Sequence, residues 1–152
     1  MNTGDPAAGA YSNRRVAHGS AATLRQLEQE GRLEGYQADF VRQTNPQDAV
    51  GPLAIASAAT VFRTVAGARA GFRQAVRAAA VPGATALSTG PLGDQAAGFM
   101  SERQAQGLTF AEFVVQWRQR NVVNAIVIEG NALGMDLGYA MRLARLQEGR
   151  ER

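Results

Sequence analysis

The clearest alternation of apolar and polar positions lies in the last third of the chain. Residues 94–104 and 108–118 alternate with a period of two and are separated by a tight turn. A second turn leads into 122–128, where both sets of alternate positions are apolar. A period of two is typical of a strand with one buried face, and a segment that is apolar on both faces indicates a central strand. These segments predict a three-stranded antiparallel meander with Ile126 in the core.

Two earlier segments, 35–42 and 53–63, also alternate as strands. The second is rich in alanine, which suits the close packing of a helix over it. Residues 1–19 are small and polar and show no period, a composition that buries too little apolar surface to order a chain. We therefore predict that 1–19 form a flexible leader.

Three further segments carry the period of about 3.6 residues that is typical of amphipathic helices. Ser20 can cap the start of the first, which ends at Gly31. The second spans 65–80, and Asp136 can cap the third, at the end of the chain.

The predicted elements follow the order helix, two strands, helix, three strands and a final helix. This order is typical of an α+β fold built on an antiparallel sheet. A chain of 152 residues can bury about 70% of its unfolded surface in one core. We therefore predict that 20–152 form a single α+β domain, in which the helices pack over one face of a single antiparallel sheet of about five strands.

Cysteine is absent from the chain, which excludes disulfides, thiolate nucleophiles and cysteine-ligated metal sites. No apolar run approaches the roughly 18 residues of a transmembrane helix, and the first residues lack the regions of a signal peptide. If the protein is exported, we expect this chain to be its processed part. The sequence carries no cofactor or metal motif, so we predict neither.

The charge of the chain is less basic than its isoelectric point of about 10.2 suggests. All 16 basic residues are arginine and 13 residues are acidic, which leaves a net charge of only +3. Arginine does not titrate until very high pH, so it raises the isoelectric point without creating a strong positive field. This balance argues against nucleic acid as the partner.

Five short motifs lie within or beside the predicted elements: LEGY at 33–36, ARAGF at 68–72, LGD at 92–94, RNVV at 120–123 and LAR at 143–145. They resemble uncharacterised exported or lipoprotein-type domains of actinobacteria and related GC-rich bacteria. In broader outline, these domains are similar to PsbP-like lipoproteins and to the extracellular sensor domain of a mycobacterial receptor kinase. The resemblance implies an extracytoplasmic location and a binding or sensing role, with a ligand in a groove between sheet and helix.

Two groups of residues are candidates for binding. Phe113 and Trp117 share one face of a strand and could line an apolar ligand groove, or they could pack in the core. Arg69, Arg73 and Arg77 recur every four residues on one side of a helix, where they could bind an anion or nucleic acid, or simply face solvent.

Candidates for catalysis are fewer. Four carboxylates lie on or beside predicted strands, and two of them could meet as the acid and base of a hydrolase: Asp39, Asp94, Glu112 and Glu129. The alternative is that they are surface charges paired with Arg42, Arg103 or Arg118. His18, the single histidine, lies in the predicted leader without a partner to hold it.

Three functions follow from these residues. The first is a non-enzymatic exported or cell-envelope domain that binds a small hydrophobic molecule, a lipid or a protein through the surface of Phe113 and Trp117. The second is an anion- or nucleic-acid-binding module that uses the three helix arginines. The third is a small hydrolase that uses paired carboxylates.

Overall fold

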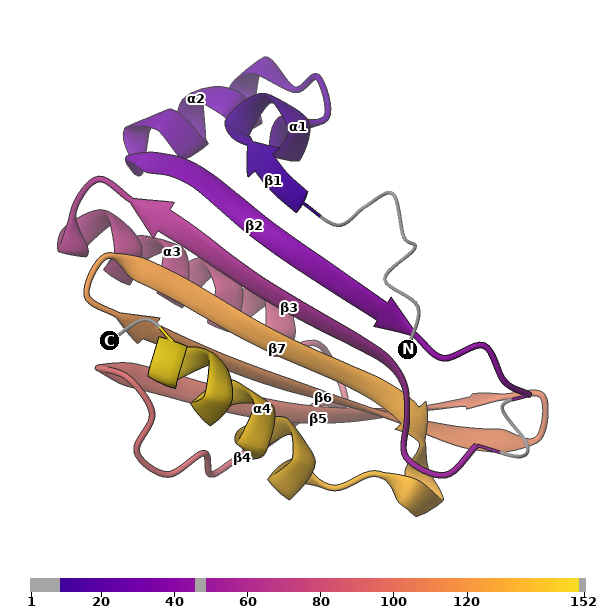
Figure 1. Cartoon of the computed structure of the whole chain (residues 1–152). Helices are drawn as coiled ribbons and strands as arrows, with labels where there is room; N and C mark the ends of the chain where they lie inside the picture. The colour runs from indigo at the N-terminus through magenta and orange to yellow at the C-terminus, as the bar shows by residue number, and fades with distance from the viewer. Residues whose placement is uncertain (1–8, 46–48, 151–152) are drawn as a thin grey trace.

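The computed structural model describes residues 9–45 and 49–150 and contains one antiparallel sheet with helices on both sides (Figure 1). Within these residues the sheet has seven strands in the spatial order β1-β2-β3-β7-β6-β5-β4, and every neighbouring pair is antiparallel. The strands are β1 (Gly9–Ser12), β2 (Arg32–Val41), β3 (Pro52–Phe62), β4 (Thr85–Leu87), β5 (Gln95–Ala105), β6 (Leu108–Gln119) and β7 (Val122–Asn131).

Two helices, α2 and α4, begin at the caps that the sequence predicts. The Ser20 hydroxyl accepts a hydrogen bond from the Thr23 amide at 3.2 Å, and the Asp136 carboxylate accepts one from the Tyr139 amide at 2.8 Å. No helix in the described part of the chain is long and apolar enough to cross a membrane. The helices are α1 (Asn13–Ala17), α2 (Ala21–Gln29), α3 (Val65–Ala79) and α4 (Leu137–Arg150), with a short 3-10 helix, η1 (Ala132–Gly134), before α4.

Over the described residues the sheet has seven strands and not about five, because two short edge strands lie in segments without a sequence pattern. β1 has four residues and β4 has three, too few for an alternation to be recognised. The longer strands agree with the prediction: β5, β6 and β7 form the predicted meander, and β2 and β3 correspond to 35–42 and 53–63.

The N-terminal segment is structured from Gly9 onward, although the sequence predicts a flexible leader over 1–19. β1 pairs with β2, and α1 follows it and buries Ala17. So short a strand is ordered by its pairing with β2 and not by its own apolar pattern, which explains why composition did not indicate it. Residues 1–8 of the predicted leader lie outside the described residues.

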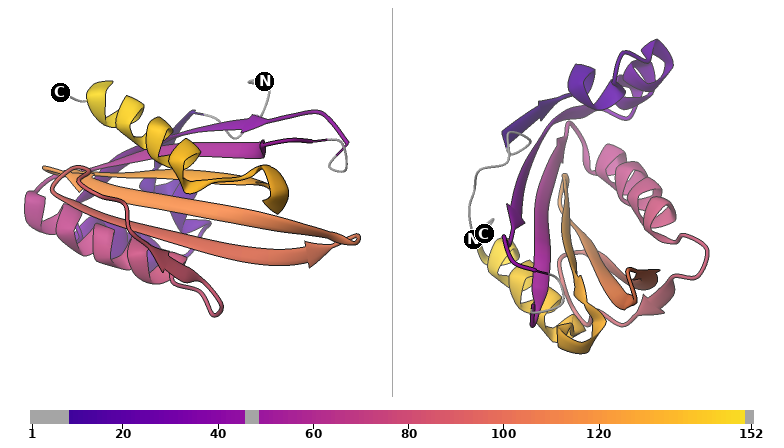
Figure 2. Two further views of the ribbon diagram at one scale, coloured as in Figure 1. Left: turned by 90° about the horizontal axis from the view of Figure 1, so that it is seen from below. Right: turned by 90° about the vertical axis from the view of Figure 1, so that its right-hand side faces the viewer.

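The two long helices cover opposite faces of the sheet, which corrects the prediction that all helices pack over one face (Figure 2, right). α4 packs through Ala140 and Ala144 on one side, here called the α4 face, and α3 packs through Ala68 and Phe72 on the other, the α3 face. α1 and α2 lie on the same side as α3. The central strands are apolar at successive positions, so each side of the sheet needs its own cover.

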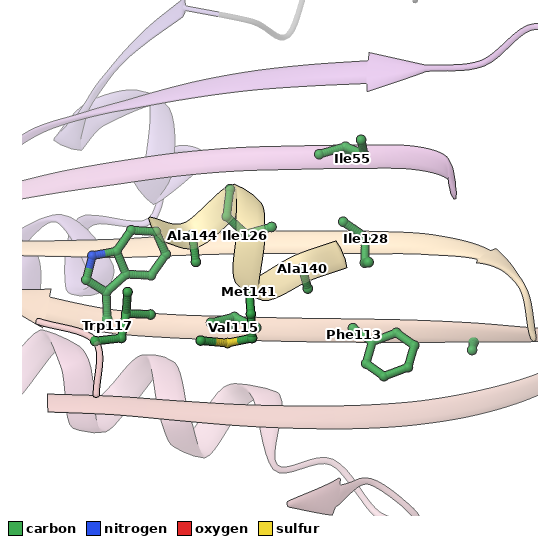
Figure 3. Packing of buried hydrophobic residues seen from close by; sticks show 11 residues of the cluster. Ile55, Phe113, Val115, Trp117, Ile126, Ile128, Ala140, Met141 and Ala144 are labelled. Carbon is green, nitrogen blue, oxygen red and sulfur yellow. The ribbon is translucent and has the colours of Figure 1, made fainter. Parts of the chain in front are cut away.

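The larger core lies on the α4 face (Figure 3). Val115, Trp117 and Ile128 are fully buried there, and Ile126 is 3% exposed. β7 occupies the middle of the strand order, so the predicted place of Ile126 in the core of a central strand is confirmed.

The α3 face is covered less completely, because α3 packs mainly on β6 and β7. The strand register places Ala54, Ala56, Ala58 and Thr60 of β3 on this face, and each remains partly exposed. The sequence predicts a helix over the alanine-rich strand. Instead, these small residues form the floor of hollows on this face, one of which borders α3.

Candidate functional site

The predicted aromatic ligand surface lies in the core. Trp117 is fully buried and Phe113 is 6% exposed, both beneath α4. Figure 3 shows their rings among the aliphatic side chains of the sheet and the small residues of α4. The structure therefore places both side chains in the core, which is the alternative that the sequence left open. No ligand can reach them unless α4 moves away from the sheet.

The predicted arginine row is exposed along α3. Arg69, Arg73 and Arg77 form no ion pair within the described residues, and they lie away from Ala68 and Phe72, which contact the sheet. The sequence between 49 and 93 contains no acidic residue, so this helix carries positive charge alone. The row is an open, solvated surface.

Asp94, one of the four candidate carboxylates, holds a buried arginine. Its Oδ2 accepts hydrogen bonds from the Arg120 amide at 2.8 Å and from Arg118 Nη1 at 2.7 Å. The backbone hydrogen bond from Arg120, together with the positive charge and hydrogen bond of Arg118, lowers the pKa of Asp94. A carboxylate held ionised in this way is a structural partner of Arg118 and is unsuited to act as a general acid.

The structure brings the other three carboxylates to one end of the α3 face. Glu112 and Glu129 face each other across β6 and β7, and Asp39 and Glu129 border the same hollow beside β3. Glu129 forms an ion pair with Arg103, as the surface-charge alternative predicts. The space beside Glu112 and Glu129 is only about 90 Å³, which is room for a few water molecules. Within the described residues, no group of three or more acidic or histidine side chains is arranged to hold a metal ion.

A larger hollow, of about 470 Å³, lies on the α3 face where β1, β2 and β3 meet α1. Arg15 and Arg32 contribute positive charge to it, while Gln37, Thr60 and Tyr11 add amide and hydroxyl groups. The described residues that line it include no aspartate or glutamate. We call this hollow the Arg32 cavity.

Arg32 is the most constrained side chain of this cavity. It is only 8% exposed, and no carboxylate forms an ion pair with it among the described residues. Nη1 donates to Asn13 Oδ1 at 2.6 Å and to the Tyr11 carbonyl at 3.4 Å, while Asn13 Nδ2 donates back to the Arg32 carbonyl at 2.8 Å. Asn13 therefore fixes both the guanidinium and the backbone carbonyl of Arg32.

The other two nitrogens of this guanidinium remain available. Nε and Nη2 of Arg32 donate to no described residue, and neither is among the fully buried side-chain atoms that lack a partner. Both therefore keep some accessible surface, in a residue that lines the cavity. Gly35 makes room for the group, since a Cβ at that position would lie 2.5 Å from Nη2. Burial lowers the pKa of Arg32, but a guanidinium remains charged at neutral pH.

The rim of the cavity comes from α1. The Arg15 guanidinium lies over the Tyr11 ring, 4.4 Å from its centroid, in a cation–π contact. His18 ends α1 in a left-handed conformation with φ of 46° and also borders the cavity. The histidine thus lies in an ordered segment, although the sequence places it in a flexible one.

Comparisons of the chain with protein-family models, with curated proteins and with solved structures found no match. The case for a site therefore depends on the arrangement of its own residues.

Sequence reasoning missed the Arg32 cavity because its parts lie in segments with different predicted structures. Asn13 and Arg15 belong to the predicted leader, and Arg32 lies in the turn before a predicted strand. One signal was present: Arg32 begins an alternating strand with Gly35 three positions later, a place where a large side chain can lie over a backbone that has no Cβ.

Proposed function

We propose that this domain is a non-enzymatic binding module that holds a small anionic molecule in the Arg32 cavity. The observation that carries the proposal is Arg32, which is 8% exposed, has no carboxylate partner among the described residues and keeps two accessible, unused donors beside an open hollow. Arginine is almost never buried unless its charge is paired, because desolvation of an unpaired charge is costly. A bound anion supplies the missing charge.

The free edge of Arg32 favours a carboxylate as the anion. Nε and Nη2 present two parallel N–H groups, which match the two oxygens of a carboxylate. Nη1 is occupied by Asn13 and Tyr11, so the orientation of this edge is fixed before the ligand arrives. Arg15 at the rim adds a second positive charge that attracts the ligand electrostatically.

Binding is a better reading of this cavity than catalysis. Its polar side chains are two arginines, an amide, hydroxyl groups and a histidine at the rim, a set that holds an anion by charge and by donated hydrogen bonds. The extracytoplasmic location implied by the sequence resemblance is part of the same proposal. A domain exposed outside the cell would use such a cavity to sense or capture a solute.

The proposal is tested by titrating the full chain with sodium benzoate, acetate and inorganic phosphate while recording amide NMR spectra. We expect benzoate to shift the signals of Gly35 and Thr60. The variant Arg32→Gln should weaken binding about tenfold or more, because it removes a charge-assisted pair of hydrogen bonds. Arg32→Lys keeps the charge without the paired donors and should retain part of the affinity.

Arg69→Gln is the matched control, since it removes an arginine from the outer face of α3 and should leave benzoate binding unchanged. Thermal melting of each variant shows whether it is folded. Binding that survives in folded Arg32→Gln but is lost in Arg69→Gln would transfer the site to the arginine row.

The arginine row supports a second candidate, an anion- or nucleic-acid-binding surface. Arg69, Arg73 and Arg77 are exposed and form no ion pair within the described residues. If all three contact phosphates, the logarithm of the affinity for a short oligonucleotide should fall with the logarithm of salt concentration with a slope of about −2 to −3. A single buried contact at Arg32 gives a much shallower slope.

A further inference from the structure

A second hollow, of about 260 Å³, adjoins the Arg32 cavity between α2 and α3. Arg32 and Thr60 line both hollows, so the two meet at these side chains. The second hollow has a different character, because its other walls are mainly apolar. They include Leu27, Phe62, Ala75, Ala78 and Val123. We call this space the α2–α3 groove.

The groove follows from the way the two helices approach each other (Figure 2, right). At one end they touch, since a Cβ at Gly67 would collide with the Glu30 carbonyl oxygen, and the Arg63 amide donates to the Gly31 carbonyl at 2.7 Å. Beyond this contact, α3 lines the groove with three small residues, Gly71, Ala75 and Ala78, and with Gln74. Gly71 lies against the Phe62 ring, where a Cβ would not fit. Small side chains on the helix therefore leave a channel that the sheet closes from below.

The two hollows together are complementary to one kind of molecule. A buried positive group with a free pair of donors lies at their junction, and an apolar channel leads away from it. An anion without an apolar part would leave the channel unfilled, and an uncharged apolar molecule would leave Arg32 without a counter-charge. A linear amphiphile satisfies both parts of the site.

We infer that the ligand is a free long-chain carboxylate whose head binds Arg32 and whose alkyl chain lies in the α2–α3 groove. This inference rests on the proposed function of the Arg32 cavity. The commitment to a carboxylate follows from the single free edge of one guanidinium, which pairs with two oxygens. The commitment to an alkyl chain follows from walls made mainly of alanine, glycine, leucine and valine with one phenylalanine ring. Glu30 and Gln74 are the polar residues that line the groove besides Arg32 and Thr60.

Chain length provides the first test. The full chain is titrated by calorimetry with acetate, butyrate, hexanoate, octanoate and decanoate, all below the concentrations at which they form micelles. A fully buried methylene contributes about 0.8 kcal/mol, a factor of about four in affinity, so an open groove should give about two- to fourfold per methylene. 1-Decanol should bind at least tenfold more weakly than decanoate, because it carries no charge for Arg32.

A pair of variants locates the chain. Ala75→Phe fills the groove and should reduce the affinity for decanoate about tenfold or more while leaving acetate and benzoate unaffected. Ala66→Phe introduces the same ring on the exposed side of α3 and should leave the affinity for all three ligands unchanged. Ala78→Phe, at an exposed position of the groove, provides a second block if Ala75→Phe does not fold.

The outcomes separate this inference from the function on which it rests. Affinity that depends on Arg32 but does not rise with chain length would overturn the inference and leave the anion site intact. Absence of any carboxylate binding would overturn both. Decyl phosphate binding more tightly than decanoate would replace the carboxylate by a phosphate head, and loss of decanoate binding in Ala66→Phe would move the chain out of the groove.

Discussion

The two faces of the sheet are built from different residues and leave different amounts of space. On the α4 face, large side chains such as Trp117 and Ile128 interdigitate with Ala140 and Ala144, and the core is closed. On the α3 face, β3 presents alanines that remain partly exposed, and two adjoining hollows lie over β2 and β3. The difference indicates a division of roles, in which one face stabilises the fold and the other can accept a ligand.

The buried charged groups add to this contrast. Arg32 and Arg118 are each less than a tenth exposed, and the strand register places both on the α3 face. Buried charge lowers stability unless it is paired, so a face that carries it contributes less to folding than an apolar one. Arg118 is paired by Asp94, whereas Arg32 has hydrogen bonds but no carboxylate partner among the residues that the structure describes. That asymmetry distinguishes a structural arginine from a candidate binding residue.

Two neighbouring valines of β6 provide the sharpest test of the difference between the two faces. They also give the largest expected change in stability. Val115 is fully buried on the α4 face, whereas Val114 is partly exposed on the α3 face. We expect Val115→Ala to lower the free energy of unfolding by about 2–3 kcal/mol, because it removes two buried methyl groups and leaves a cavity. Val114→Ala should cost less than about 1 kcal/mol. Urea denaturation measures both, and equal losses would show that the two faces are packed alike.

The sequence predicted the long elements well, because their periods are set by burial. The β5–β7 meander, the caps at Ser20 and Asp136 and the core position of Ile126 all appear in the structure. The covering of both faces was not predicted. The residue pattern shows that a strand is apolar on two sides, but it does not show which helix covers which side.

The candidate site was harder to predict than the fold. Arg32, Asn13 and Thr60 lie far apart in the sequence and meet only because β1 and α1 fold back beside β2 and β3. The aromatic pair on β6 was easy to propose because its residues lie close together in the sequence, but the structure buries both side chains. An alternating strand shows that Phe113 and Trp117 share a face, and nothing in their spacing tells a buried face from an exposed one.

Asn13→Ala tests whether the hydrogen bonds of Asn13 fix the orientation of Arg32 before a ligand binds. Its expected effect on stability is smaller than that of Val115→Ala. The substitution removes the hydrogen bonds that Asn13 makes with Nη1 and the carbonyl of Arg32. We expect a loss of about 1 kcal/mol in the free energy of unfolding, typical of such side-chain hydrogen bonds. Affinity for benzoate should fall as well, because Nη1 becomes free to rotate away. Ser12→Ala, which removes the cap of α1, is the control for disturbance of the N-terminal segment. If both variants weaken benzoate binding equally, Asn13 has no specific role at Arg32.

Asp94→Asn gives the smallest expected effect. It tests whether the Asp94 carboxylate balances the charge of Arg118, the other buried arginine on the α3 face. The pKa of Asp94 is lowered in the folded protein, first by the hydrogen bond from the Arg120 amide and then by Arg118. A carboxylate with a lowered folded pKa stabilises the protein fully above its unfolded pKa of about 3.9, and this contribution is lost as pH falls through the folded value. The side chain of Asp94 is 48% exposed, so solvent screens the interaction and keeps the contribution small.

The measurement is therefore a difference in melting temperature between wild type and Asp94→Asn as a function of pH. We expect the variant to melt slightly lower at pH 7 and the difference to shrink below about pH 4, where the wild-type carboxylate begins to take up a proton. Glu102→Gln, an exposed substitution on β5, should show no comparable convergence. Arg118 keeps acceptors in the Arg120 carbonyl at 2.7 Å and Gln95 Oε1 at 2.9 Å, so the variant should remain folded. A difference that stays constant down to pH 3 would mean that the Asp94 charge does not stabilise the fold, and that Arg118, like Arg32, is held by neutral acceptors alone.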